Sequence, residues 1–345
     1  MLRIITAFFV RLAERWMPDP LVVAVLLTFV ALAAAIALTD FGPIESVGAW
    51  GVGFWGLLQF TMQMVLILGL GHLLAHTRPV NRGLVWLSDR VHSAEGAYAG
   101  IALAGAICGM FSWGVALIVP AVLSRILAAN CAERGIRVHF PLLVACGWLG
   151  SGTSMQGLSA SIPLTINTPG HFLEAEIGLI PLSATILSVW SLGILGAKVV
   201  FIPALLSRLG PQGDDIREMP PLPAGSFNTP YEAPSELDTP SQKIEHARVI
   251  TLSLAALGAV YLADHFLKGG SLNLNTLNMI VLVLGLALVD SPRHYLHLLA
   301  NAGRVVSPFF VQYPLYAGIM GIIATSGLGA LLVNAFVAVS DAESL

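Results

Sequence analysis

The sequence predicts an all-α polytopic membrane protein with about seven to eight membrane segments, including a re-entrant hairpin and broken helices. Composition supports this class: of 345 residues, 56% are hydrophobic and only 11% are charged, whereas soluble globular proteins have about 25% charged residues. Charged residues are also absent between Glu45 and Arg78 and between Arg137 and Glu174. Since a helix crosses the hydrocarbon core with about 20 apolar residues, each interval has room for a crossing.

The remaining composition narrows the class of function. A net charge of −3 argues against a nucleic-acid partner. The three cysteines, Cys108, Cys131 and Cys146, are interpreted as small buried hydrophobes rather than as disulfides or metal ligands. We therefore expect no cofactor and no metal.

The chain divides at one polar, proline-rich segment, residues 207–247, which is too hydrophilic for the bilayer and is interpreted as a linker. It separates a first membrane half, 1–206, from a second half, 248–345. Residues 2–17 alternate apolar and basic positions, which is typical of an amphipathic helix at the membrane surface. The apolar stretches that follow are 21–39, 54–75, 97–123, 141–168 and 178–206 in the first half, and 249–266, 274–290 and 305–339 in the second.

Arginine placement predicts the orientation. Arg3, Arg11 and Arg15 precede the first span, so the positive-inside rule places the N-terminus in the cytoplasm. The loops at 76–96 and 124–140 both carry arginines and therefore both favour the cytoplasmic side. We accordingly predict that 97–123 enters and returns as a hairpin that turns near residues 109–114. A plain span followed by an arginine-rich outer loop is the alternative.

The stretch 147–171 is the main candidate for a binding site, because it is uncharged and at membrane depth yet rich in hydroxyls, amides and glycines. Non-helical backbone in a bilayer is tolerated only beside protein or a water-filled cavity, and broken helices there bind carboxylates through exposed N–H groups. The alternative is that the small residues only allow helices to pack closely. The candidate substrate-binding residues are Ser151, Thr153, Ser154, Gln156, Ser159, Asn167 and Thr168.

Two further segments are candidates for the same site. Trp113, beside Ser112 at the predicted hairpin turn, could form an apolar wall, although core packing explains a lone Trp-Gly equally well. Gln312 and Tyr313 lie where Pro308 and Pro314 interrupt a helix and leave backbone groups in need of partners.

Other ionisable residues favour structural interpretations. The pairs His72/His76 and His294/His297 share helix faces, but no carboxylate lies within either pair, so interfacial histidines explain them better than a metal. Lys198 is interpreted as snorkelling to the interface, with a place in a transport pathway as the alternative. No arrangement of nucleophile and base is evident, so an enzyme is not expected.

The chain resembles the short-chain fatty acid transporter family along essentially its whole length. The residues that carry the resemblance are Arg15-Trp16-Met17-Pro18-Asp19-Pro20-Leu21, Trp50-Gly51-Val52-Gly53-Phe54-Trp55, Met62-Gln63-Met64, Gly71-His72, Trp113-Gly114, Thr168-Pro169-Gly170, Asn275-Thr276-Leu277-Asn278, Val311-Gln312-Tyr313-Pro314-Leu315-Tyr316-Ala317-Gly318-Ile319 and Ser326-Gly327-Leu328-Gly329. The resemblance implies a bacterial inner-membrane carrier of acetoacetate, butyrate and similar monocarboxylates. It also implies a distant relationship to anion carriers built from hairpins and broken helices in two repeats.

We therefore expect a carrier that takes up short carboxylates, with protons as the coupling ion and the lipid bilayer as its surroundings. A carrier of another small anion of the dicarboxylate type is the runner-up, and an intramembrane enzyme is a third class. The family resemblance implies a further C-terminal segment with a glycine-rich stretch ending in His-Trp. Because the chain stops at Leu345 without it, a fragment, or a truncated product that cannot transport, is the alternative to a working carrier.

Overall fold

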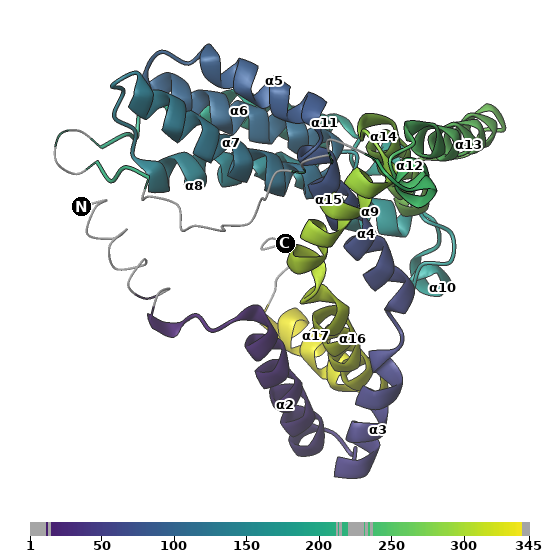
Figure 1. Cartoon of the computed structure of the whole chain (residues 1–345). Coiled ribbons are helices and arrows are strands. Elements are labelled where there is room, and N and C mark those ends of the chain that lie inside the picture. Colours follow the sequence, from purple (N-terminus) through teal and green to yellow (C-terminus); the bar gives the residue numbers. More distant parts are fainter. Residues whose placement is uncertain are drawn as a thin grey trace. The chain divides into compact units, whose positions relative to one another are not determined.

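The computed structural model describes residues 12, 15–211, 213, 216–219, 231, 234 and 237–339 (Figure 1). The described residues form helices and no strand, which confirms the predicted all-α class. They group into two compact units, residues 1–62 with 307–345 and residues 63–306. The predicted surface helix at 2–17 and most of the 207–236 segment lie outside the described residues, and the predicted division into halves at 207–247 stays a prediction.

The first unit contains α2 (Pro20–Leu38), α3 (Pro43–Phe54), the start of α4 (Leu58–Ala75), α16 (Phe309–Thr325) and α17 (Leu328–Val339). The Asp19 carboxylate accepts a hydrogen bond from the Leu21 N–H at 2.8 Å, which caps α2 where the sequence predicts the first span to begin. The predicted stretch at 305–339 is broken at Ser326 and Gly327.

Close packing of α3 on α16 explains the small residues of this unit. A methyl group on Gly53 would lie 2.7 Å from the Gly321 Cα, so the two backbones meet with no room for a side chain. One turn away, the Trp50 ring packs against Gly318, where a methyl group would lie 2.5 Å from the indole. Trp50 therefore contributes to helix packing in this unit.

The second unit contains the rest of α4 and the other helices. They are α5 (Arg78–Asp89), α6 (Ala94–Phe111), α7 (Trp113–Glu133), α8 (Phe140–Ser151), the 3-10 helix η1 (Gly152–Met155), α9 (Ser161–Ile166), α10 (Glu174–Ile177), the 3-10 helix η2 (Leu182–Ala184), α11 (Val189–Leu206), α12 (Pro240–Glu245), α13 (Arg248–Leu267), α14 (Leu274–Leu288) and α15 (Pro292–Val306). In the predicted apolar stretch at 178–206, the long helix α11 therefore begins only at Val189.

Helices α6 and α7 form the predicted hairpin. They are separated by Ser112 alone, whose extended backbone (φ −150°, ψ 125°) ends one helix and begins the other. A methyl group on Gly105, seven residues before the turn, would lie 3.3 Å from the Pro120 ring, eight residues after it, so the arms run antiparallel. The arms have 18 and 21 residues, each long enough to cross a membrane, and therefore extend beyond the predicted bounds of 97–123.

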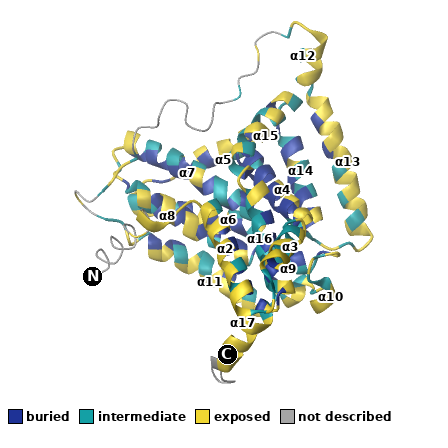
Figure 2. Ribbon diagram, turned by 90° about the horizontal axis from the view of Figure 1, so that it is seen from below, coloured by how far each residue is buried: buried dark blue, intermediate teal, exposed yellow. Residues whose placement is uncertain are grey.

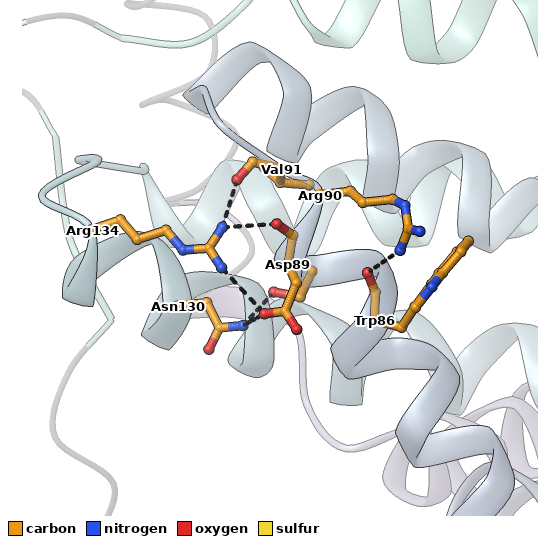
Figure 3. Close-up of polar contacts among 7 residues, drawn as sticks. Trp86, Asp89, Arg90, Val91, Asn130 and Arg134 are labelled. Atoms are coloured by element: carbon orange, nitrogen blue, oxygen red, sulfur yellow. Dashed lines mark hydrogen bonds and ion pairs between the residues drawn. The ribbon is translucent and has the colours of Figure 1, made fainter.

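Polar contacts at the open end of the hairpin join the end of α7 to the end of α5 and to the loop that leads into α6 (Figure 3). The Arg134 guanidinium donates to the backbone carbonyls of Asp89 and Val91 at 3.0 and 3.1 Å and pairs with the Asp89 carboxylate at 3.2 Å. Asn130 donates to the Ser88 hydroxyl at 2.9 Å. The two arginine-bearing loops therefore lie on the same side of the hairpin, as their charge predicts.

Most of the long helices expose apolar side chains, as Figure 2 shows by the yellow length of α13. Seven helices in the described part of the chain are long and apolar enough to cross a membrane. Val200 and Phe201 on α11, and Leu257 and Val260 on α13, each expose 64% or more of their surface. Exposure of apolar faces of this extent to water is unfavourable, so these faces are suited to contact lipid or another membrane helix.

Candidate functional site

Two helix breaks meet inside the second unit. Helix α8 ends at Ser151, one turn of 3-10 helix follows, and regular helix resumes only at Ser161, as the polar composition of 147–171 predicts. This interrupted backbone lies against the turn between α6 and α7: the Leu158 N–H donates to the Met110 carbonyl at 2.7 Å, and the Trp113 N–H donates to the Ser159 hydroxyl at 2.6 Å. We call Ser112, Trp113, residues 152–159 and the neighbouring Lys198 the break cluster.

Helix α4 closes the cluster from another direction. A methyl group on Gly71 would lie 2.8 Å from the Gly114 carbonyl carbon, so α4 crosses α7 immediately after the break. Within the loop, Thr153 and Ser159 are fully inaccessible, whereas Met155 is exposed. The cluster therefore combines irregular backbone with protein on several sides, the condition under which such backbone is stable within a bilayer.

Three of the predicted hydroxyls already donate to backbone carbonyls. Ser151 donates to Trp148 at 2.6 Å, Thr153 to Ala106 at 2.8 Å and Thr168 to Leu164 at 2.6 Å. A hydroxyl has a single proton to donate. In this arrangement these side chains hold the broken backbone in place and have no proton left for a carboxylate.

Other donors in the break cluster have no hydrogen-bond partner in the described part of the chain. The Ser112 hydroxyl and the Trp113 indole N–H are buried and make no hydrogen bond with the described residues. Ser154 is 7% exposed, and its hydroxyl makes no hydrogen bond within the described part of the chain. Unpaired buried polar groups are expensive, so their occurrence together indicates a place where a ligand or water completes the bonding.

Lys198 lies beside the interrupted loop, a contact that the sequence does not predict. Its ammonium donates to the Gln156 side-chain oxygen at 2.7 Å and to the Gly152 carbonyl at 3.4 Å. Its ammonium therefore bonds within the protein, and its place in a transport pathway stays a prediction. The signal in the sequence was its position, near the centre of an otherwise uncharged apolar helix.

Asn167 and Thr168 lie at a second polar contact, at the start of α14. Asn167 donates to the Leu272 carbonyl at 2.8 Å, and the Leu274 N–H donates to the Thr168 hydroxyl at 3.3 Å. At the next residue of α14, the Asn275 side chain accepts a hydrogen bond from the Gln63 amide at 2.8 Å. These two predicted residues therefore link the end of the interrupted stretch to α14.

Gln312 and Tyr313 lie in the first unit. The Gln312 amide donates to the Tyr316 hydroxyl at 2.7 Å, and the Tyr313 ring stacks on Phe309 with centroids 5.6 Å apart. Phe60 meets the same ring edge-on at 5.7 Å. Their part in substrate binding stays a prediction.

The histidine pairs take no visible part in the break cluster. His72 and His76 lie with ring centroids 4.3 Å apart on α4. His294 stacks on Tyr231 at 4.8 Å, beside a surface hollow of about 640 Å³ that is lined mainly by polar and charged residues of the linker end, α12 and α15. Within the described ranges, His, Cys, Asp and Glu form no group of three or more that could hold a metal ion.

The helical architecture, the exposed apolar faces and the paired helix breaks define a multi-pass membrane protein of the broken-helix type. The chain belongs to the short-chain fatty acid transporter family, whose profile it matches over residues 1–345.

Two curated relatives agree with this assignment. A protein of Escherichia coli (strain K12) is 34% identical over 346 residues, and one of Haemophilus influenzae (strain ATCC 51907 / DSM 11121 / KW20 / Rd) is 31% identical over 351 residues. Each match covers 99% of this chain and 77% of the relative, and each relative is named "Putative short-chain fatty acid transporter". No solved structure matches the chain.

Proposed function

We propose that the protein takes up short-chain fatty acids and similar small monocarboxylates across the bacterial inner membrane, and that it binds them at the break cluster. The observation that carries this proposal is the meeting of two helix breaks around donors that have no hydrogen-bond partner among the described residues. They are the buried Ser112 hydroxyl and Trp113 indole N–H, together with the Ser154 hydroxyl. A carboxylate has oxygen acceptors and no proton of its own, so it complements such donors.

Backbone electrostatics support the same ligand class. The 21-residue helix α7 begins at Trp113, and the N-terminal end of a helix carries a partial positive charge. The indole ring of Trp113 adds an apolar surface at the same position, suited to a tail of a few carbons. The proposed site thus offers donors for the carboxylate beside an apolar wall for the tail.

Proton coupling is part of the proposal. An anion that enters a cell moves against an inside-negative potential, at about 2.3 kcal/mol per charge and 100 mV. If a proton enters with the anion, no net charge crosses the membrane, so the membrane potential no longer opposes uptake. We further propose, from the arginines near the first span and in the hairpin loops, that the N-terminus is cytoplasmic.

The test is uptake of radiolabelled butyrate and acetoacetate into proteoliposomes that contain the protein. Ser154→Ala should lower uptake about tenfold, because a hydrogen bond to a charged group contributes about 1.5–3 kcal/mol. Ser253→Ala is a matched control, since Ser253 is an exposed serine of α13 that bonds only within its own helix turn.

The controls separate the possible failures. Wild-type uptake no greater than that of empty liposomes would refute the transport proposal. Uptake of succinate in place of butyrate would show that the protein is a carrier of the dicarboxylate type. Equal uptake by the Ser154 and Ser253 variants would refute substrate binding at the break cluster, without refuting the transport proposal.

A further inference from the structure

Lys198 occupies an unusual position for a lysine in a membrane helix. The chain has three lysines, and this one lies nine residues after the start of α11 at Val189 and eight before its end at Leu206. At 1.5 Å per residue, about 12 Å of helix separates it from the nearer end. A cation at the centre of a span is rare and marks a functional position in most membrane proteins.

The surroundings of Lys198 provide acceptors but no negative charge. The ammonium is bonded to the amide oxygen of Gln156 and the backbone carbonyl of Gly152, both within the interrupted loop. Among the described residues, no carboxylate lies within 4.0 Å of it. Two neutral dipoles stabilise an ammonium less than a carboxylate does, so the charge at this site is incompletely compensated.

We propose that Lys198 is the cation that binds the substrate carboxylate, and that the Gln156 side-chain oxygen takes the place of that carboxylate in the empty site. This assignment rests on the proposed function and names the charge by which the break cluster recognises its substrate. An amide oxygen and a carboxylate oxygen approach an ammonium at similar distances, so the exchange requires only a rotation of the Gln156 side chain.

One cation in the site also determines which anions fit. A monocarboxylate neutralises the Lys198 ammonium, so the occupied site has no net charge. A dicarboxylate would bring a second negative charge for which the break cluster, as defined above, has no cationic side chain. A neutral amide of the same shape, such as butyramide, would gain nothing over Gln156 itself. The proposed device therefore selects short monocarboxylates by charge.

The first experiment compares butyrate with butyramide as competitors for bound radiolabelled butyrate, with the protein in lipid nanodiscs. Wild-type protein should prefer butyrate about tenfold to 100-fold, the range of a charge-assisted hydrogen bond. Lys198→Met should lose this preference, and Lys198→Arg, which keeps the charge, should retain part of it. Gln156→Ala should bind butyrate more tightly than wild type does, because the competing oxygen is gone.

A purely structural bond between Lys198 and Gln156 predicts a different pattern. Loss of either partner would then weaken binding to the same degree, without changing the preference for butyrate over butyramide. That result in folded variants would overturn the proposal. Wild-type protein that takes up no butyrate would instead refute the proposed function itself.

A second measurement needs no variant and covers the case in which Lys198→Met does not fold. An amine-reactive reagent is applied to wild-type protein with and without butyrate, and labelling of each lysine is followed by mass spectrometry. Butyrate should slow the labelling of Lys198 and leave Lys243 and Lys268, which lie outside the break cluster, unchanged as internal controls. Equal labelling of Lys198 with and without saturating butyrate would overturn the assignment.

Discussion

Replacement of Gly105 by alanine tests the packing that holds the break cluster together. The added methyl group would lie 2.6 Å from the Gly147 carbonyl oxygen and 3.1 Å from the Ser151 backbone nitrogen. Carbon and oxygen approach to about 3.3 Å, so α6 and α8 would have to separate by about 0.7 Å. Overpacking of this kind costs about 1–3 kcal/mol, and here it acts directly on the residue where α8 ends.

The matched control is Gly100→Ala on the same helix. A methyl group there would have the Val91 side chain as its nearest neighbour, at 3.9 Å, which is an ordinary contact. Because alanine favours the helical state by about 0.5–1 kcal/mol over glycine, this variant should be as stable as wild type or more so.

The assay is thermal unfolding of the detergent-solubilised protein, followed by size-exclusion chromatography with fluorescence detection. At about 2–4 °C per kcal/mol, Gly105→Ala should lower Tm by several degrees, whereas Gly100→Ala should not lower it. Gly105→Ala should also reduce butyrate uptake at temperatures below its Tm, because the α8 end moves. Equal Tm values for the two variants would refute the inferred α6–α8 contact.

Three further outcomes are expected. Thr153→Val keeps the shape of the side chain but removes its bond to Ala106, so Tm should fall by an amount equivalent to about 1 kcal/mol, measured in the same thermal assay. Asp89→Asn should lower the free energy of unfolding by less than about 1 kcal/mol, because the Asp89–Arg134 pair is exposed and Arg134 keeps its backbone acceptors (Figure 3). A larger loss in the same thermal assay would contradict this. A protonophore should abolish butyrate accumulation in energised vesicles, and unaffected accumulation would exclude proton coupling.

The local sequence determines much of the architecture. Hydropathy and charge spacing place the membrane segments because each span must be apolar over its own length, whatever its neighbours are. The arginines on both sides of 97–123 predict a hairpin, and the turn at Ser112 lies within the predicted interval. The polar composition of 147–171 likewise predicts interrupted helix, because serine, glycine and proline in succession do not sustain a lipid-facing helix.

Tertiary structure alone decides which of the polar residues are available to a ligand. The sequence presents Thr153 and Ser154 as equivalent donors, yet the Thr153 hydroxyl bonds to the Ala106 carbonyl, 47 residues away, and the Ser154 hydroxyl makes no hydrogen bond with the described residues. Lys198 lies 42 residues from Gln156 along the chain, so no local pattern could reveal their contact. Hydropathy is a property of each segment, whereas the partner of a buried polar atom depends on segments far apart in the sequence, and only their packing decides it.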